Sequence, residues 1–245
     1  MFPHTPKVGI ITQARMTSTR LLGKILKTVN NKTLLQYHIE RLQHTGASIV
    51  IATTINATDD CVCQYALDNN INYYRGSEHN VLSRFYETAL KFNYDIIVRV
   101  TSDCPLIDGN LIQQSIAHYL QLNNPNLYMG NGVERTYARG FDFELFSFQL
   151  LKEAYNNATE MADLEHVTPY IWQNKSGQVQ LHHITQATNN SHLRITVDTA
   201  EDFELIQELI QNYGADKLTY TEIEQLLVTH PNLVAINEHI EQKKL

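Results

Sequence analysis

Short apolar runs alternate with longer segments of helical periodicity through the first half of the chain. Continuous apolar runs predict buried strands at residues 8–11, 48–54, 71–76 and 95–101. Apolar positions spaced three and four residues apart predict helices at residues 34–42, 59–70, 80–92 and 109–122. Strands that alternate with helices in this way predict an α/β protein with a parallel, doubly wound sheet.

The second half of the chain is less regular, although strands and helices still follow one another. Its pattern predicts strands at residues 127–132, 141–148, 178–184 and 193–199. It predicts helices at residues 150–158, 164–172, 200–213 and 219–230, of which the one at 164–172 is kinked or begins at Pro169. No repeat, low-complexity stretch or linker divides the chain. We therefore expect one domain over residues 1–245, in which residues 125–190 form an insertion that covers the site or builds a dimer.

Composition and charge narrow the class of protein further. The 245 residues are 43% hydrophobic and 18% charged, which is ordinary for a globular protein, and no apolar stretch is long enough to span a membrane. The N-terminus lacks the features of a secretory signal, and the three cysteines favour reduced thiols, so we expect a cytoplasmic location. The net charge of −7 disfavours nucleic acid as a partner, whereas a small anion needs only a local basic site.

The strongest local motif is the basic loop, residues 13–24, which follows the first predicted strand. It carries Arg15, Arg20 and Lys24, together with hydroxyl side chains at residues 17–19. Ligands of open α/β sheets bind at the edge where such a loop leaves its strand. Cations and hydroxyls there suit a triphosphate that releases pyrophosphate. The alternative is a solvated basic loop without a ligand.

A second motif lies where the predicted strand at residues 95–101 ends. Strand periodicity places Arg99, Thr101 and Asp103 on one side, and Pro105 prevents further sheet. A carboxylate at this edge, facing a triphosphate, is typical of a magnesium ligand. The alternative is that Asp103 caps the following turn.

Asp198 also ends a predicted strand, just before a helix. Two carboxylates at strand ends can hold Mg²⁺ between them, while water and phosphate oxygens complete the octahedron. The alternative is that Asp198 or Thr199 caps the helix.

A third group of charged residues lies in the less regular half. Asp142 and Glu144 are two positions apart on a predicted strand, so both carboxylates face one way. Beside Arg135 they are suited to recognise the hydroxyls and the carboxylate of a sugar, although a salt-bridge cluster explains the same pattern. His166, in the same half, is more typical of a structural histidine than of a catalyst.

Taken in order along the chain, these motifs resemble the SpsF-type cytidylyltransferases of spore-coat polysaccharide biosynthesis. That group is related to the CMP-Kdo and acylneuraminate cytidylyltransferases. The resemblance covers residues 7 to about 210. It rests on the segments 13–26, 52–60, 75–85, 98–108, 140–148, 165–172 and 193–205.

The resemblance implies a fold and a reaction. The fold would be the Rossmann-like nucleotide-diphospho-sugar transferase fold, a mostly parallel mixed sheet with helices on both faces. The reaction would transfer CMP from CTP to a sugar acid, either Kdo-like or nonulosonate-like, with release of pyrophosphate. The resemblance also implies Mg²⁺ as cofactor and a homodimer in which residues 125–190 face the sugar and help to form the interface.

The resemblance further assigns roles to individual residues. Catalytic roles would belong to Arg15, Lys24 and Asp103. The nucleotide would be bound by Ala14, Arg15, Thr17, Ser18, Arg20, Lys24, Arg99, Thr101, Ser102 and Asp103. The sugar would be bound by Arg135, Asp142, Glu144 and His166. The metal ligands would be Asp103 and Asp198.

Three positions depart from the family pattern. Leu22 replaces a proline in the basic loop, and Ala138 replaces another proline before the segment at 140–148. Ser102 stands where the family has glycine, and we expect it to narrow the space for the nucleotide or to donate a hydrogen bond to it. Two alternatives remain open. Leu22 and Ser102 allow a non-catalytic nucleotide-binding protein. Asp142 and Glu144 imitate the metal-binding acidic pair of a glycosyltransferase of related fold that uses a nucleotide-sugar.

Overall fold

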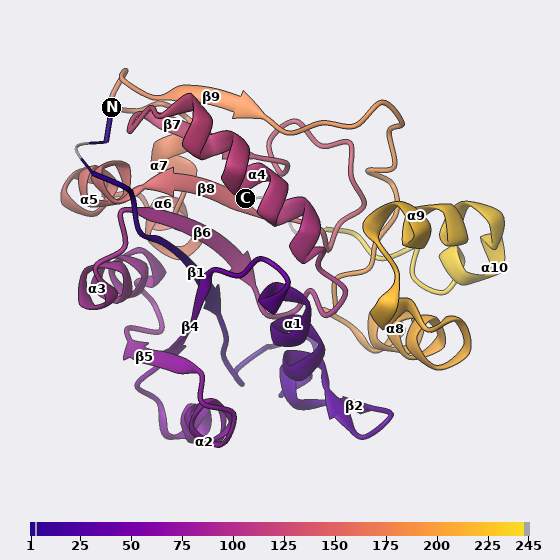
Figure 1. Cartoon of the computed structure of the whole chain (residues 1–245). Helices are drawn as coiled ribbons and strands as arrows, with labels where there is room; N and C mark the ends of the chain where they lie inside the picture. The colour runs from indigo at the N-terminus through magenta and orange to yellow at the C-terminus, as the bar shows by residue number, and fades with distance from the viewer. Residues whose placement is uncertain (3, 243–245) are drawn as a thin grey trace.

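Helices cover both faces of one large, mostly parallel sheet (Figure 1). The structure, a computed structural model, describes residues 1–2 and 4–242. Seven strands form the sheet: β1 (Val8–Gln13), β4 (Ser48–Thr54), β5 (Asn72–Gly76), β6 (Ile96–Thr101), β7 (Leu127–Gly130), β8 (Glu144–Ser147) and β9 (Gln180–His183). Their spatial order is β5-β4-β1-β6-β8-β7-β9, and β2 (Thr28–Val29) and β3 (Lys32–Thr33) form a separate hairpin.

The four strands of the first half are parallel, whereas the second half adds one reversed strand. β1 pairs in parallel with β4 and β6, and β4 pairs in parallel with β5. β8 runs antiparallel to both β6 and β7, and β9 runs parallel to β7. The predicted α/β fold class, a mostly parallel mixed sheet, is therefore confirmed. Residues 125–190 extend this same sheet, and their part in substrate binding or in a dimer stays a prediction.

Neighbouring residues on the strands face opposite sides of the sheet, which gives the molecule two main layers of core. Ile10 and Val98 pack with α1 (Leu34–Gln43), α4 (Gly109–Leu122) and α8 (Ala200–Tyr213). Ile11 and Ile97 pack on the other face with α3 (Val81–Phe92), α5 (Phe148–Asn157) and α7 (Pro169–Trp172). The remaining helices are α2 (Asp60–Asp68), α6 (Met161–His166), α9 (Tyr220–Thr229) and α10 (Pro231–Val234). Short 3-10 turns occur at Lys24–Leu26, Ala57–Asp59 and Ala215–Lys217.

One predicted strand of the second half differs from its expected form, and one predicted helix is broken as expected. The predicted strand at 193–199 is extended but makes one isolated bridge, between Arg194 and Arg139. Its backbone hydrogen bonds go to loop residues and not to a neighbouring strand. For example, Val197 N–H donates to the Asp103 carbonyl at 2.8 Å. The break predicted at Pro169 in the helix at 164–172 is confirmed, because α7 begins at that proline. Val167 separates α7 from α6, since its φ of 72° is incompatible with a continuous helix.

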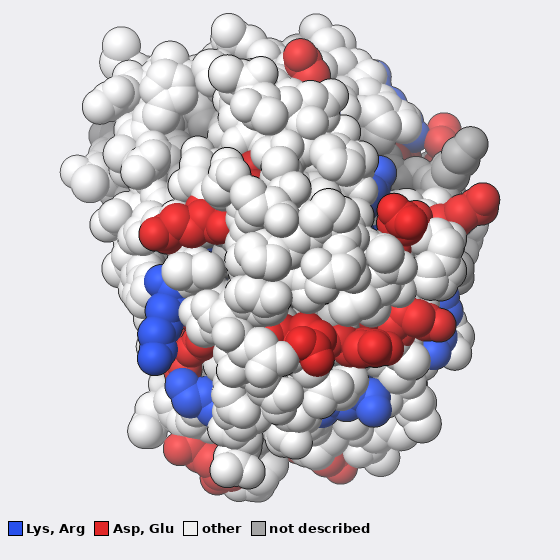
Figure 2. Space-filling view, turned by 90° about the vertical axis from the view of Figure 1, so that its right-hand side faces the viewer, with Lys and Arg blue, Asp and Glu red and all other residues white. Residues whose placement is uncertain are grey.

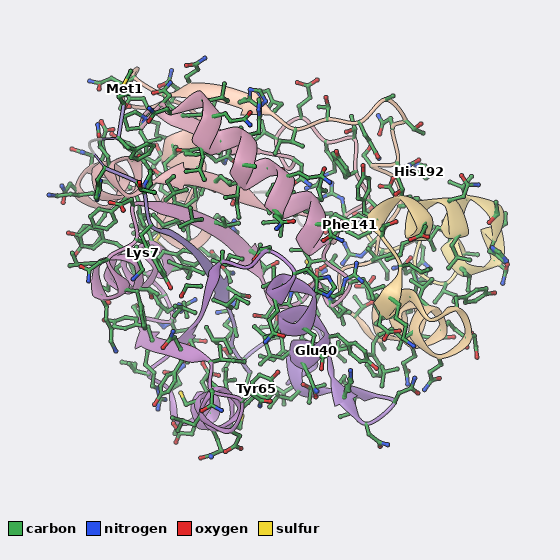
Figure 3. The ribbon with its side chains drawn as sticks, in the orientation of Figure 1. Met1, Lys7, Glu40, Tyr65, Phe141 and His192 are labelled. Carbon is green, nitrogen blue, oxygen red and sulfur yellow. The ribbon has the colours of Figure 1, made fainter. Side chains whose placement is uncertain are left out.

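The predicted strand at 141–148 begins only at Glu144, because the residues before it pack into the hydrophobic core and do not pair with a neighbouring strand. Phe141 is 1% exposed, and its ring meets that of Tyr220 edge-on with centroids 6.1 Å apart. Figure 3 shows Phe141 between the sheet and the C-terminal helices. The segment therefore joins α9 to the sheet instead of extending β8.

Charged side chains are distributed unevenly over the surface. Figure 2 shows the face that carries the C-terminal helices, where Asp and Glu form a band and much of the area above it bears no charge. Among the residues that the structure describes, no helix is both long enough and apolar enough to cross a membrane.

Candidate active site

The basic loop leaves β1 at the carboxyl edge of the sheet and is held in place by two acidic residues. Met16 N–H donates to Asp59 Oδ1 at 2.7 Å, and the Thr17 hydroxyl donates to Glu78 Oε1 at 2.5 Å. Gly23, with φ of 64°, allows the loop to turn back, and its N–H donates to the Met16 carbonyl at 3.1 Å. The loop therefore has a defined shape around the space that follows β1.

Lys24, at the end of this loop, lies between the two carboxylates that the sequence singled out. Its Nζ is 2.7 Å from Asp103 Oδ2 and 2.8 Å from Asp198 Oδ1. Asp103 follows β6 and Asp198 precedes α8, so the fold brings two distant segments together at one point. Lys24 as a whole is 8% exposed. The three side chains thus form one partly buried ionic cluster.

Two arginines hold Asp198 from its other side. Arg20 Nη2 lies 2.8 Å and Arg194 Nη2 lies 2.9 Å from Asp198 Oδ2. Arg194 also pairs with the buried Asp202, whose carboxylate accepts the backbone N–H of Asp198 at 2.9 Å. The alternative role that the sequence left open, capping of α8, belongs to Thr199, which forms a capping box with Asp202. Asp198 is therefore left to face the basic loop.

The ionic cluster keeps Asp103 and Lys24 charged. Burial works against ionisation of Asp103, but the charge and hydrogen bond of Lys24 lower the pKa of Asp103 to about 2. Burial likewise lowers the pKa of Lys24, but Asp103 and Asp198 outweigh that effect and raise it above its ordinary value. Both groups are ionised throughout the neutral range.

The turn that carries Asp103 is fixed by a buried hydrogen-bond network beneath it. His38 is fully buried, and burial lowers its pKa to about 4, so the ring is neutral at pH 7. Nδ1 of His38 lies 2.8 Å from the Cys104 carbonyl and must donate, so Nε2 accepts from the Thr12 hydroxyl at 2.9 Å. The Ser102 hydroxyl lies 2.8 Å from both Thr12 Oγ1 and the Gln13 carbonyl.

This network accounts for Ser102, which is 1% exposed. Its hydroxyl is engaged with the protein interior, and a hydrogen bond from it to a nucleotide stays a prediction. The side chain supports the turn from below, where a glycine would provide no hydroxyl.

Two cavities open beside the ionic cluster. The basic cavity has a volume of about 240 Å³ and is lined by the basic loop, Arg84, Asp103 and Asp198. The aromatic cavity has a volume of about 390 Å³, and Tyr128, Phe143 and Trp172 form much of its wall. Thr101 and His166 line both cavities. The two spaces therefore meet next to Asp103.

The charged groups of the aromatic cavity are paired with one another. Glu144 accepts from Arg99, and it also accepts from the hydroxyls of Tyr128 and Thr168 at 2.6 Å each. Asp142 pairs with Arg135, and its Oδ2 accepts the Gly140 N–H at 3.0 Å. The salt-bridge cluster that the sequence left open is thus present. The carboxylates also line a cavity, and their recognition of a sugar stays a prediction.

The residues that could hold a metal are the two carboxylates of the ionic cluster. Within residues 1–2 and 4–242, no group of three or more His, Cys, Asp or Glu side chains could hold a metal ion. Asp103 and Asp198 nevertheless converge on a single cationic group, the ammonium of Lys24. Their oxygens are the donors that Mg²⁺ prefers, and Mg²⁺ commonly takes one or two carboxylates and completes its shell with phosphate and water. The donor set fits the predicted metal, provided that Lys24 moves.

Comparison with known proteins decides the family. The family model described as cytidylyltransferase matches residues 9–231. The chain belongs to the cytidylyltransferase family. The spore coat polysaccharide biosynthesis protein SpsF of Bacillus subtilis is 30% identical over 244 residues, which cover 93% of this chain and 97% of SpsF.

Solved structures agree with this assignment. A cytidylyltransferase from Leptospira borgpetersenii superposes with a TM-score of 0.87 and is 30% identical, covering 98% of this chain and 100% of its own. A CMP:2-keto-3-deoxy-manno-octonic acid synthetase complexed with CTP has a TM-score of 0.61 at 15% identity, covering 84% of this chain and 99% of its own, which shows a shared fold. The resemblance found in the sequence is confirmed, and the chain is a nucleotidyltransferase.

Most predicted site residues of this cytidylyltransferase line the two cavities. The basic cavity is lined by Ala14, Arg15, Ser18, Arg20, Lys24, Thr101, Ser102, Asp103 and Asp198. The aromatic cavity is lined by Arg135, Asp142, Glu144 and His166. Their roles in binding and catalysis stay predictions.

Two predicted nucleotide-binding residues lie elsewhere. Thr17 holds Glu78 at the edge of the basic loop instead of lining the basic cavity. Arg99 lines the aromatic cavity, because β8 pairs with β6 so that Glu144 stands opposite Arg99 in register and takes its guanidinium.

Sequence reasoning missed three buried polar residues of the site. Arg194 could have been found, because it shares one side of the extended segment with Asp198. His38 lies on the apolar face of α1, and nothing in the sequence indicates that its ring bonds to the Asp103 turn. Arg84 lies within the predicted helix at 80–92. It is three positions from Val81 and so shares the apolar face of that helix, where a cation is unusual and could have indicated a functional residue.

Proposed function

We propose that this cytidylyltransferase transfers CMP from CTP to a sugar acid, Kdo-like or nonulosonate-like, and releases pyrophosphate for surface polysaccharide biosynthesis. The printed name of SpsF supports the polysaccharide context, and that of the octonic acid synthetase supports CTP and a sugar acid. Family membership supports the class of reaction.

The observation that carries the proposal is the meeting of two different cavities at Thr101 and His166. The basic cavity, with its cations and hydroxyls, suits a triphosphate. The aromatic cavity combines apolar walls with carboxylates and hydroxyls, which is typical of a site for a small polar ligand such as a sugar. A sugar hydroxyl held in one cavity would thus approach the α-phosphorus of a nucleotide held in the other.

The proposed reaction is an in-line displacement. The oxygen of the sugar hydroxyl forms a bond to the α-phosphorus and releases its proton to water. The bond from that phosphorus to the bridging oxygen breaks, and pyrophosphate leaves with the bonding electrons. Arg15, Arg20 and Lys24 stabilise the negative charge that gathers on the leaving group, and positioning by the two cavities lowers the entropic part of the barrier. Release of Lys24 toward the phosphates frees the carboxylates of Asp103 and Asp198.

Asp103 and Asp198 would hold Mg²⁺ in this scheme. The ion, when bound, neutralises charge on phosphate oxygens. The residues around it support this role, because Arg194 and Asp202 fix the orientation of Asp198, and the network of His38 and Ser102 fixes the Asp103 turn.

The test is pyrophosphate release from CTP with Mg²⁺ and a panel of sugar acids that includes Kdo and nonulosonic acids. We expect turnover with one of these acids and loss of at least a hundredfold in Asp103→Ala. The variant Lys91→Met, which alters an exposed cation on α3 that lines neither cavity, serves as the matched control. No pyrophosphate release with any acid, or full turnover by Asp103→Ala, would contradict the proposal.

The glycosyltransferase alternative receives less support. It needed Asp142 and Glu144 as a metal-binding pair, but both carboxylates are paired with arginines. Transfer of sugar from a nucleotide-sugar without formation of pyrophosphate would favour it. The non-catalytic alternative depended on Leu22 and Ser102, yet Leu22 is 78% exposed and Ser102 is buried in the protein interior.

The proposed reaction also carries proposals on location and assembly. CTP is supplied in the cytoplasm, so we place the enzyme there. We retain the homodimer with residues 125–190 at its interface, and light scattering on the purified protein tests it: a mass of one chain at micromolar concentration would contradict it.

A further inference from the structure

Arg84 is a buried cation of the basic cavity that lies outside the basic loop. It belongs to α3, is 2% exposed and lines the cavity together with Arg15 and Lys24. Its Nη1 donates to the Ser77 carbonyl at 2.6 Å, whereas its buried Nε has no hydrogen-bond partner among the residues that the structure describes. Within residues 1–2 and 4–242, no carboxylate lies close enough to form an ion pair with Arg84.

The other buried arginines of the described chain differ in this respect. Arg194 pairs with both Asp198 and Asp202. Arg41 donates to three backbone carbonyls, those of residues 107, 216 and 218. The guanidinium of Arg84 is therefore under-satisfied, although buried charges are normally paired or fully hydrogen-bonded.

Gly76, at the end of β5, leaves space for the Arg84 side chain. A Cβ atom added to Gly76 would lie 2.9 Å from Arg84 Cγ and 3.1 Å from Arg84 Cβ, so the end of β5 leaves room for this side chain. Arg84 is consequently held at a fixed place beside the cavity instead of moving freely at its surface.

The charge of Arg84 persists despite its burial. Burial first, and Arg15 second, lower the pKa of Arg84 to about 10, against the opposing charges of Asp59 and Glu78. The group therefore stays protonated at neutral pH. An unpaired buried cation is costly for stability. Arg15, Arg20 and Lys24 line the same cavity, which therefore concentrates positive charge on its loop side.

We propose that Arg84 is a nucleotide-binding residue that pairs with the triphosphate, beside Arg15. This inference rests on the proposed function and adds a phosphate-binding residue outside the basic loop. A polyphosphate supplies the negative charge that Arg84 lacks, whereas the cytosine ring is neutral and supplies only hydrogen-bond acceptors. Without nucleotide, the unpaired Arg84 lowers the stability of the folded protein; with nucleotide, it increases the affinity for the triphosphate.

Calorimetry with CTP, with inorganic pyrophosphate and with cytidine tests the assignment on the full chain. We expect Arg84→Met to weaken binding of CTP and of pyrophosphate at least tenfold and to leave cytidine binding unchanged. We expect Arg84→Lys, which retains the charge, to recover part of the affinity. Lys91→Met, on the same helix and with the same change of charge, should bind all three ligands as the wild type does.

Thermal unfolding without ligand separates this role from a structural one. We expect Arg84→Met to unfold at or above the wild-type temperature, because it removes an unpaired buried cation and keeps an apolar chain of similar length. A lower unfolding temperature together with unchanged CTP affinity would overturn the inference. Should Arg84→Met fail to fold, Arg84→Gln, which retains a donor for Ser77, provides the same comparison.

Three further outcomes are distinguishable. Unchanged pyrophosphate affinity with a loss of discrimination between CTP and UTP would overturn the phosphate assignment in favour of base recognition. Binding of CTP by the wild type and by Arg84→Met with equal affinity would overturn the inference and leave the proposed function standing, whereas a wild type that binds no CTP would overturn the proposed function itself.

Discussion

Asp103 and Asp198 accept hydrogen bonds from the same ammonium group, that of Lys24, at 2.7 and 2.8 Å. The two carboxylates come from opposite halves of the chain and would repel each other without a cation between them. Lys24 therefore occupies the place that the proposed metal requires. The carboxylate pair can serve the reaction only after this lysine moves.

This arrangement predicts that Lys24 opposes metal binding until the nucleotide arrives. In the absence of CTP, Lys24→Met should bind Mn²⁺ at least tenfold more tightly than the wild type, because the carboxylates lose their internal counterion. The same variant should lose about a hundredfold in kcat, or about 3 kcal/mol, because one cation aimed at the leaving group is gone. Titration followed by electron paramagnetic resonance measures the affinity.

Arg20→Met is the matched control for this experiment, because Arg20 contacts Asp198 but not Asp103. It should change metal affinity much less than Lys24→Met does. Equal Mn²⁺ affinity in the wild type and in Lys24→Met would show that Lys24 does not compete with the ion.

A second prediction concerns Ser102, where the family has glycine. Because its hydroxyl donates its one proton either to the Gln13 carbonyl or to Thr12 Oγ1, Ser102→Gly should lower the free energy of unfolding by about 1–3 kcal/mol. Affinity for CTP should stay within twofold of the wild type. Urea denaturation and calorimetry measure the two quantities, and Ser102→Ala separates loss of the hydroxyl from gain of backbone freedom. Markedly tighter CTP binding by Ser102→Gly would show instead that the serine restricts the nucleotide.

The first half of the fold was predictable because its strands are buried on both faces. Ile96, Ile97 and Val98 are fully buried, so the strand reads as a continuous apolar run whatever its neighbours are. The segment 193–199 has the same appearance, but its backbone bonds go to Arg139 and to the Asp103 turn. Periodicity predicts which residues are buried; it does not predict which backbone will pair with them.

The site was predictable at the level of the elements and less so at the level of side-chain partners. Parallel strands end at one edge of the sheet, so the convergence of Asp103 with the basic loop followed from order along the chain. The position of Lys24 between two carboxylates, and the pairing of Arg99 with Glu144, depend on side-chain reach and on the register of β8. These relationships are long-range and leave no local signal.

A third prediction separates the two cavities. Glu144→Gln should lower kcat/KM for the sugar acid by about 10- to 100-fold, or about 1.4–2.8 kcal/mol, because Arg99 loses its partner and the wall of the aromatic cavity rearranges. Binding of CTP should be nearly unchanged, since Glu144 does not line the basic cavity. Steady-state kinetics with each substrate varied in turn measures both effects. An equal loss for the two substrates would mean that the cavities do not divide the substrates in this way.

The last prediction is that His38 makes the protein sensitive to mild acid. The pKa of His38 is lowered from 6.5 to about 4 by full burial, so between these values the unfolded chain binds a proton that the folded protein excludes. The stabilisation from the neutral ring is therefore complete above about pH 6.5 and is lost as the pH falls toward 4, in an amount on the order of 3 kcal/mol.

His38→Gln should be less stable than the wild type at pH 7, yet it should lose less stability between pH 7 and pH 4.5. Urea denaturation at the two values measures the difference, and His192→Gln, at an exposed histidine, should follow the wild type. Parallel loss of stability in the wild type and in His38→Gln would assign the acid sensitivity to other groups.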